Sequence, residues 1–233
     1  ELEQVRNLVI SSCEGVDNNP FLSSIGRFLI KKIFLNSIKN RRKVLQFYHS
    51  NKEFIEANGR FKAPVIITGF PRSGTTLLQR LISEDPNTRS PYTFEMEVPT
   101  PPMVSEINPM EDPRIKKTGA VISALSRFAP GFMEKFAESH LWSAIEMEES
   151  FIYMLAHNCI NVLNSATSGR AYMEDFFKIE TMRPIYRYER LFFTMLDAYR
   201  PAKSHWTLKA PIYAASFPNI FKEYPDVRVV VTH

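Results

Sequence analysis

The sequence predicts an α/β fold in which helices flank a central parallel sheet. Two short runs, residues 65–68 and 227–232, are apolar and largely β-branched, which is typical of strands buried on both faces. Residues 205–208 form a third, shorter strand candidate. Helical patterns alternate with these runs, as they do where helices cover a parallel sheet. The 233 residues, of which 44% are hydrophobic, suffice for one full-sized domain with a core.

The first part of the chain has a helical pattern. In residues 21–58, apolar residues such as Leu29, Ile33 and Phe34 recur at helical spacing. Ala63 and Pro64 then break the pattern before the strand at 65–68. We therefore expect two parts: a helical segment, residues 1–62, and a domain, residues 63–233, that contains the sheet.

The second part alternates between helical and irregular segments. A helix opens at Thr75 and ends at Asp85 and Pro86. Residues 86–113 are rich in proline, so they form neither a regular helix nor a central strand. This segment is either a surface linker or an ordered loop across the mouth of an active site, and the second interpretation is favoured because long ordered loops are often functional. Further helices are expected at 114–128, 143–165, 181–199 and 217–224, with a turn at 165–169.

Residues 65–76 carry most of the functional information. A β-branched run ends at Gly69, a tight loop follows, and a helical pattern opens at Thr75. Gly69 and Gly74 have the spacing of a P-loop, whose backbone N–H groups hold phosphate oxygens. Thr75 stands where a P-loop nucleotide hydrolase has lysine, and Arg72 is the nearest cation. The stretch is interpreted as a cradle for an oxyanion; the alternative is a glycine turn with an incidental arginine.

Several stretches resemble one known family. Phe-Pro-Arg-Ser-Gly-Thr-Thr-Leu-Leu at residues 70–78 resembles the 5′-phosphosulfate loop of sulfotransferases that use 3′-phosphoadenosine-5′-phosphosulfate (PAPS). Trp-Thr-Leu-Lys-Ala-Pro at 206–211 and the strand that ends in Thr-His at 232–233 look like later motifs of that family. Residues 91–95 resemble a Pro-x-Thr-Trp-Glu segment of the family, and His140 followed by Glu148 and Glu149 resembles a helix entry typical of its bacterial-type branch. The resemblance covers residues 63–233 and implies a P-loop NTPase-like fold.

The resemblance also implies a donor substrate and the residues that hold it. Arg72 and Lys209 are expected to stabilise the charge that builds up on the leaving phosphate oxygen during transfer. No metal is required, because the loop cation replaces magnesium. The residues expected to bind PAPS are Gly69, Pro71, Arg72, Ser73, Gly74, Thr75 and Thr76.

An acceptor hydroxyl must lose a proton during transfer, so a general base is needed. Glu95 is the first candidate, because other branches of the family place a glutamate at a similar distance beyond the loop. Glu148, Glu149 and His140 are the alternatives. The competing interpretation of Glu148 and Glu149 is that they are charges on a helix surface, and His157 is expected in the core.

The chain departs from the family pattern at three positions and at its end. Ala210 stands where the family has serine, Phe94 where it has tryptophan, and Tyr213 where it often has histidine. The sequence stops at His233, before the arginine that grips the 3′-phosphate in the family. We therefore expect the N-terminal part of a longer enzyme.

Two other functions compete with PAPS-dependent sulfotransfer. A P-loop kinase or NTPase with a degenerate lysine would bind magnesium-ATP and would need an acidic residue at a strand end, whereas the strand at 227–232 is followed by His233. A truncated, non-catalytic sulfotransferase-like protein is the other alternative.

Charge and hydrophobicity limit the kinds of molecule with which the chain is expected to interact. The net charge of +4 is mild, and the cations cluster only at residues 39–43, so nucleic acid is not expected as a partner. The resemblance to sulfotransferases implies a small-molecule or carbohydrate acceptor. The basic run is interpreted as a solvated helix face, and a phosphate or membrane contact is the less favoured interpretation. No apolar run approaches the roughly 20 residues of a membrane span. A cytoplasmic location is expected, although an anchor could precede Glu1, and the oligomeric state stays open. Cys13 and Cys159 lack metal or redox spacing.

Overall fold

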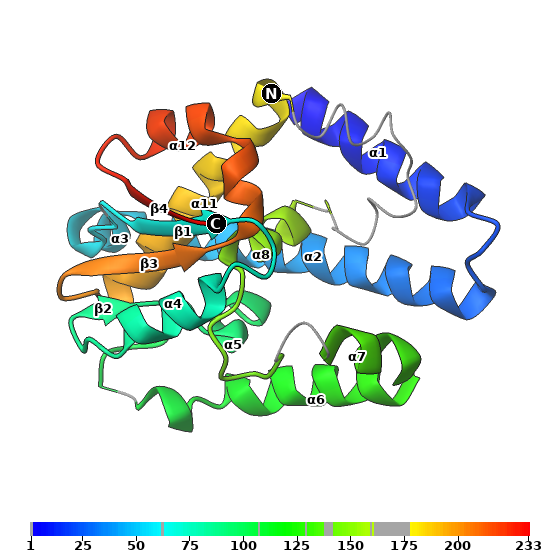
Figure 1. The fold of residues 1–233 in the computed structure, drawn as a ribbon, viewed down its shortest axis with the longest axis horizontal. Helices are drawn as coiled ribbons and strands as arrows, with labels where there is room; N and C mark the ends of the chain where they lie inside the picture. Colours follow the sequence, from blue (N-terminus) through cyan, green and yellow to red (C-terminus); the bar gives the residue numbers. More distant parts are fainter. Residues whose placement is uncertain are drawn as a thin grey trace.

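The computed structural model describes residues 2–61, 63–106, 108–128, 130–137, 142–158, 160 and 178–233. Within them lies a four-stranded, wholly parallel sheet of order β2-β3-β1-β4, which confirms the predicted fold class (Figure 1). The strands are β1 (Val65–Gly69), β2 (Thr88–Arg89), β3 (His205–Lys209) and β4 (Arg228–Thr232). Every residue of β1 is buried, as expected for a central strand. The two-residue strand β2 was not predicted, because it lies in the proline-rich segment.

Helices cover both faces of this sheet at β1 and β3. Strand β4, at the edge, is largely exposed, so the prediction that its apolar run is buried on both faces is wrong. Helix α4 (Thr75–Ser83) lies on one face, and α11 (Ile179–Tyr199) and α12 (Phe217–Glu223) lie on the other (Figure 1). Side chains alternate between the faces along each strand. Trp206 therefore faces α11, where it contacts the ring of Phe193, while Lys209 faces α4.

Three helices precede the sheet: α1 (Leu2–Asn18), α2 (Ser24–Ser50) and α3 (Lys52–Asn58). The Ser23 side chain caps α2 by accepting a hydrogen bond from the backbone N–H of Gly26. The predicted helix at 21–58 is divided at Asn51, whose N–H bonds back to Phe47 and Tyr48 at the end of α2. Val44 of α2 and Ile55 of α3 belong to the same buried cluster as the sheet.

The proline-rich segment is ordered and partly interior. It contains β2, α5 (Thr93–Glu97) and the short 3-10 helix η1 (Pro109–Glu111). Phe94, Glu95 and Met96 in α5 are fully buried. The interpretation as a surface linker is therefore wrong. The remaining described helices are α6 (Arg114–Phe128), α7 (Pro130–Ala137), α8 (Ser150–His157) and the 3-10 helix η2 (Pro211–Ala215).

Helix α8 begins later than predicted. The sequence predicts a helix from residue 143, but backbone carbonyls before Ser150 form hydrogen bonds with α5 instead. The N–H groups of Thr93 and Phe94 donate to the carbonyls of Glu146 and Ala144. Tertiary bonds thus replace helical ones over 143–149. The predicted turn at 165–169, the end of the predicted helix at 165, Cys159 and His140 lie outside the described residues.

His157 lies in the core, as predicted. Its Nδ1 is 3.0 Å from the Tyr188 hydroxyl, and its Nε2 is 3.0 Å from the Met96 carbonyl. Burial lowers the pKa of His157 to about 4, so the ring is neutral at physiological pH. No helix in the described part of the chain is both long and apolar enough to cross a bilayer.

Candidate active site

Two glycines, Gly69 and Gly74, shape the backbone of the loop between β1 and α4. Gly69 has φ +148°, and a Cβ added there would lie 2.2 Å from the backbone oxygen of Thr232. Gly74 has φ +87° and precedes the first turn of α4, and a Cβ there would meet no atom within 4 Å. Gly69 therefore permits the close approach of β1 to β4, and Gly74 leaves open space in front of the helix. Arg72 also adopts the left-handed region, at φ +69°.

The N-terminus of α4 is left open toward this space. Gly74, at the cap position, supplies no side chain, and no described side chain caps this helix. The first backbone N–H groups of a helix lack intrahelical partners and carry partial positive charge. The N-terminus is therefore suited to an anionic group. The Ser73 hydroxyl, in contrast, closes the loop onto β4: it lies 2.5 Å from the Thr232 hydroxyl and 2.6 Å from the Phe70 carbonyl.

The structure places Lys209 directly beside the loop helix. Lys209 ends β3 and aligns with Ile67 of β1, so its side chain rises at the carboxyl edge of the sheet. The side chain is only 1% exposed. Its Nζ lies 3.4 Å from the Thr76 hydroxyl and 3.5 Å from a carboxylate oxygen of Glu149. Lys209 is therefore a buried cation that faces the opening of α4.

Glu148 and Glu149 are buried beside this lysine and are not charges on a helix surface. Glu149 sits at the N-cap position of α8 and makes no capping hydrogen bond there. Burial raises the pKa of Glu148 to about 7; Lys209 partly opposes this shift and Glu149 adds to it. Near neutral pH, Glu148 can therefore both accept and release a proton.

Three further contacts hold the segment that carries these carboxylates. Arg80 of α4 forms an ion pair with Glu146 at 2.6 Å. The Thr93 hydroxyl donates to the Glu146 carbonyl at 3.0 Å, and Tyr92 pairs with Met147 in an isolated antiparallel bridge. The segment is thereby attached both to α4 and to the start of α5.

Glu95, the first candidate for the base, is placed differently. One of its carboxylate oxygens lies 2.5 Å from Arg89 Nη2, and the other accepts a hydrogen bond from the backbone N–H of Tyr92 at 3.1 Å. Arg89 in turn lies over the ring of Trp206 and donates to the carbonyls of Leu196 and Arg200. These contacts give Glu95 a structural role within α5 and do not favour a role as base.

A second polar cluster lies behind the site. The Tyr213 hydroxyl, in η2, donates to Glu189 at 2.5 Å and lies 3.1 Å from the Ser150 hydroxyl. Tyr224 donates to the other Glu189 oxygen at 2.9 Å. Burial raises the pKa of Glu189 to about 8. Through Tyr213 the cluster joins η2, which follows Lys209, to Ser150, which follows Glu149. It therefore helps to position both Lys209 and Glu149.

The sequence singled out Arg72, the loop residues and Lys209, but it did not predict that Lys209 pairs with Glu149. The signals in the sequence were that two adjacent carboxylates precede an apolar helical run and that they resemble a feature of the family's bacterial-type branch. The approach of α8 to β3 depends on packing and leaves no mark in the local pattern.

Known proteins were found that resemble the chain in sequence and in fold. Residues 64–233 match the profile of the sulfotransferase family. The crystal structure of sulfotransferase STF9 from Mycobacterium avium superposes with a TM-score of 0.78 at 22% identity, covering 94% of this chain and 54% of STF9. That of STF1 from Mycobacterium tuberculosis H37Rv gives 0.77 at 21% identity, covering 98% and 60% respectively. No curated protein sequence matches the chain.

The two solved structures support the fold, and the chain spans somewhat more than half of the length of each. The family profile covers the loop, Lys209 and the paired carboxylates in a single stretch. Because that stretch is well over half of the 233 residues, the chain belongs to the sulfotransferase family.

Proposed function

We propose that this chain binds the phosphosulfate end of PAPS and takes part in transfer of the sulfuryl group to a hydroxyl or amine acceptor. The observation that carries the proposal is the position of Lys209, whose buried Nζ lies 3.4 Å from the Thr76 hydroxyl at the open N-terminus of α4. A buried cation at such an opening stabilises negative charge far better than a solvated one.

The donor groups around the opening suit a phosphosulfate. The α4 N-terminus and the hydroxyls of Thr75 and Thr76 would hold phosphate oxygens. Gly69, Pro71, Ser73 and Gly74 shape the loop, and Arg72 supplies an exposed guanidinium for the oxygens of the transferred group. Lys209 would stabilise the phosphate oxygen from which the sulfuryl group departs.

Glu148 is the better candidate for the base. Its raised pKa, about 7, lets the carboxylate take the acceptor's proton near neutral pH, which is the condition for efficient general-base catalysis. Glu149, 3.5 Å from Lys209, balances the buried charge of that lysine. Glu95 stays a prediction from the sequence that its contacts with Arg89 and Tyr92 do not favour.

A magnesium-dependent kinase is the weaker alternative. In P-loop kinases and NTPases, an acidic residue at the end of a strand helps hold the metal. Here the strands on either side of β1 end in Lys209 and Thr232. Neither residue is acidic, and the positive charge of Lys209 would repel a bound Mg²⁺.

Calorimetry of the whole chain with 3′,5′-adenosine bisphosphate, the spent donor, tests the proposal. We expect micromolar binding without metal, and at least tenfold weaker binding in Lys209→Met and Arg72→Ala. Arg127→Ala, which removes an exposed guanidinium from α6, is the matched control and should bind as the parent chain does. Tighter binding of magnesium-ATP would favour the kinase, and equal binding by all variants would refute the assignment of the loop.

A further inference from the structure

Helix α2 presents an outward face that the described part of the chain does not cover. The helix contains seven Lys or Arg residues and no Asp or Glu. Two of the seven are used inside the fold: Arg27 donates to carbonyls at the end of α1, and Arg41 bonds to Asn158. The other five are exposed: Lys31, Lys32, Lys39, Arg42 and Lys43.

Large apolar side chains are interleaved with these cations. Ile25, Phe28, Leu35 and Ile38 are each at least half exposed. On a helix of 3.6 residues per turn they fall on the same side as the five exposed cations, while Phe34, Ser37 and Val44 fall on the buried side. We call this outward side the α2 face.

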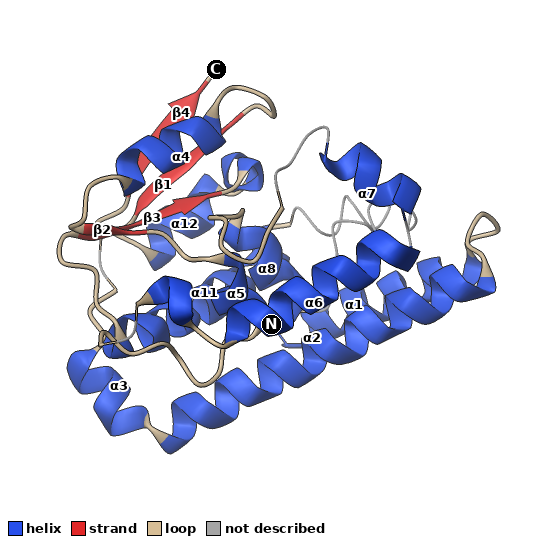
Figure 2. Ribbon diagram, turned by 90° about the horizontal axis from the view of Figure 1, so that it is seen from below, coloured by secondary structure: helices blue, strands red, loops and turns tan. Residues whose placement is uncertain are grey.

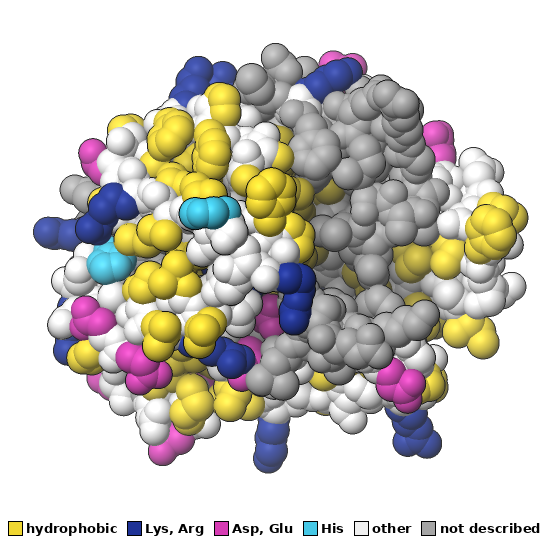
Figure 3. Space-filling view, in the orientation of Figure 1, with side chains coloured by type: hydrophobic (Ala, Val, Ile, Leu, Met, Phe, Trp, Pro, Cys, Tyr) yellow, Lys and Arg dark blue, Asp and Glu magenta, His cyan; other side chains and the backbone are white. Residues whose placement is uncertain are grey.

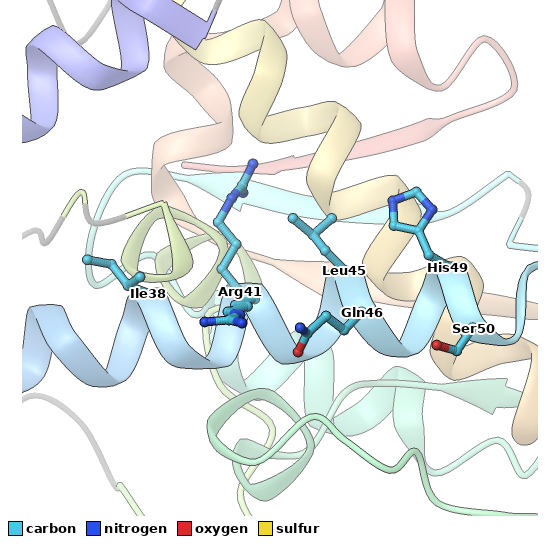
Figure 4. A pocket seen from close by; sticks show the side chains of 7 residues that line it. Ile38, Arg41, Leu45, Gln46, His49 and Ser50 are labelled. Atoms are coloured by element: carbon cyan, nitrogen blue, oxygen red, sulfur yellow. The ribbon is translucent and has the colours of Figure 1, made fainter.

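The apolar surface continues beyond the helix. Phe21, in the connection from α1 to α2, is 95% exposed. Hydrophobic side chains are visible at the right-hand edge of the molecule, over this connection (Figure 3). Toward its other end, α2 lines an open pocket with apolar Leu45 and basic Arg42 and His49 (Figure 4).

We propose that the α2 face docks onto an anionic membrane surface. A helix that lies in a bilayer interface combines apolar side chains, which enter the acyl boundary, with Lys and Arg, whose stems extend along it to reach the headgroups. The complete absence of acidic residues on α2 matches a negatively charged leaflet. One neighbouring acid, Asp17 of α1, forms an exposed ion pair with Lys31 at 3.2 Å, and the other four exposed cations of α2 form no ion pair within the described residues.

The interleaved apolar residues separate this proposal from nucleic-acid binding. Binding to a phosphate backbone depends on cations and has no need of exposed phenylalanine or leucine among them. A bilayer needs both, because neither charge nor apolar area alone gives firm attachment. The geometry also leaves the candidate active site open: α2 runs along the lower margin of the molecule in Figure 2, and the carboxyl end of β4 lies at the opposite margin.

Vesicle flotation of the whole chain tests the proposal. One arm uses pure phosphatidylcholine vesicles, and the other uses vesicles with about one third phosphatidylserine. We expect flotation only with the anionic vesicles. The triple variant Lys32→Glu, Lys39→Glu, Lys43→Glu should partition at least about a hundredfold more weakly. Its control, Lys116→Glu, Lys117→Glu, Lys222→Glu, changes the net charge by the same amount, from +4 to −2, at exposed sites elsewhere.

A second pair of variants tests the apolar part. Phe28→Ser with Leu35→Ser should weaken partitioning by roughly tenfold or more. Leu81→Ser with Phe221→Ser removes comparably exposed side chains from α4 and α12 and should not change it. Circular dichroism verifies that each variant is folded, and Lys39→Ala with Lys43→Ala replaces the triple variant if that one unfolds.

Three results would overturn the proposal: no flotation of the parent chain, an equal loss in the charge-matched control, or an unchanged affinity of the Phe28 and Leu35 variant. In the last case the α2 face is a general polyanion surface, and titration with duplex DNA would reveal it. Binding of adenosine bisphosphate should be the same in every variant, so this test is independent of the proposed donor site.

Discussion

Replacing Glu95 with glutamine distinguishes a structural carboxylate from a catalytic one. The substitution keeps the size and one acceptor oxygen of the side chain but removes its charge. Glu95 is fully buried, and its partner Arg89 has a side chain only 6% exposed. The variant therefore leaves a guanidinium buried without its counter-charge.

The expected cost follows from that burial. Removing one partner of a buried ion pair destabilises a protein by about 3–5 kcal/mol. The lower end applies here, because Arg89 keeps its bonds to the carbonyls of Leu196 and Arg200, and the amide oxygen of the new glutamine can still accept from Tyr92. We expect the free energy of unfolding to fall by about 3 kcal/mol.

Urea unfolding followed by circular dichroism measures this change. Glu53→Gln, on the exposed surface of α3, is the control and should shift the free energy of unfolding by less than about 0.5 kcal/mol. The double variant Arg89→Met, Glu95→Leu removes both charges and should cost less than the two single substitutions together. Its remaining cost would come from the two carbonyls that lose a donor.

One outcome would refute the reasoning. If Glu95→Gln unfolds at the same urea concentration as the parent chain while sulfuryl transfer is lost, the carboxylate acts on the reaction and not on the fold. Glu148 would then lose its place as the preferred base.

The remaining predictions concern pH and the loop glycines. Folding raises the pKa of Glu189 from 4.5 to about 8, so the folded state holds this proton more tightly than the unfolded chain does. The resulting stabilisation is fully present below pH 4.5 and is lost as the pH rises through about 8. Glu189→Gln should therefore flatten the dependence of the free energy of unfolding, measured in urea, on pH. Carbon-13 NMR of labelled glutamates should show one carboxylate that titrates near pH 7 and disappears in Glu148→Gln; a midpoint near 4.5 would count against Glu148 as base. Gly69→Ala should lower the thermal midpoint more than Gly74→Ala, because only the first added Cβ meets the backbone oxygen of Thr232; the reverse order would contradict the loop geometry.

The sequence was most informative where local chemistry is unambiguous. The apolar runs at β1 and β4 predicted a parallel sheet, although only β1 is buried and β4 is largely exposed. Gly69 and Gly74 identified the loop, because few residues other than glycine adopt these backbone angles. It was least informative at α5 and α8. Long-range hydrogen bonds from Thr93 and Phe94 occupy the backbone before Ser150, and no local pattern reveals them.

The carboxylates show the same division. The sequence ranked Glu95 above Glu148, because other branches of the family place a glutamate at a similar distance beyond the loop. Folding buries Glu95 against Arg89 and brings Glu149 to Lys209, 60 residues further along the chain, so the contacts in space favour Glu148 as the proposed base.

The sequence by itself determined the fold class and predicted a loop suited to an anion, with Arg72 and Lys209 as its cations, because strand hydrophobicity, glycine conformation and helix polarity are properties of short segments. Tertiary structure alone decided which carboxylates face Lys209, that the pKa of Glu148 lies near 7, and that the cations of α2 share one outward face with exposed apolar residues. These properties depend on desolvation and on contacts between distant segments, which exist only once the chain has folded.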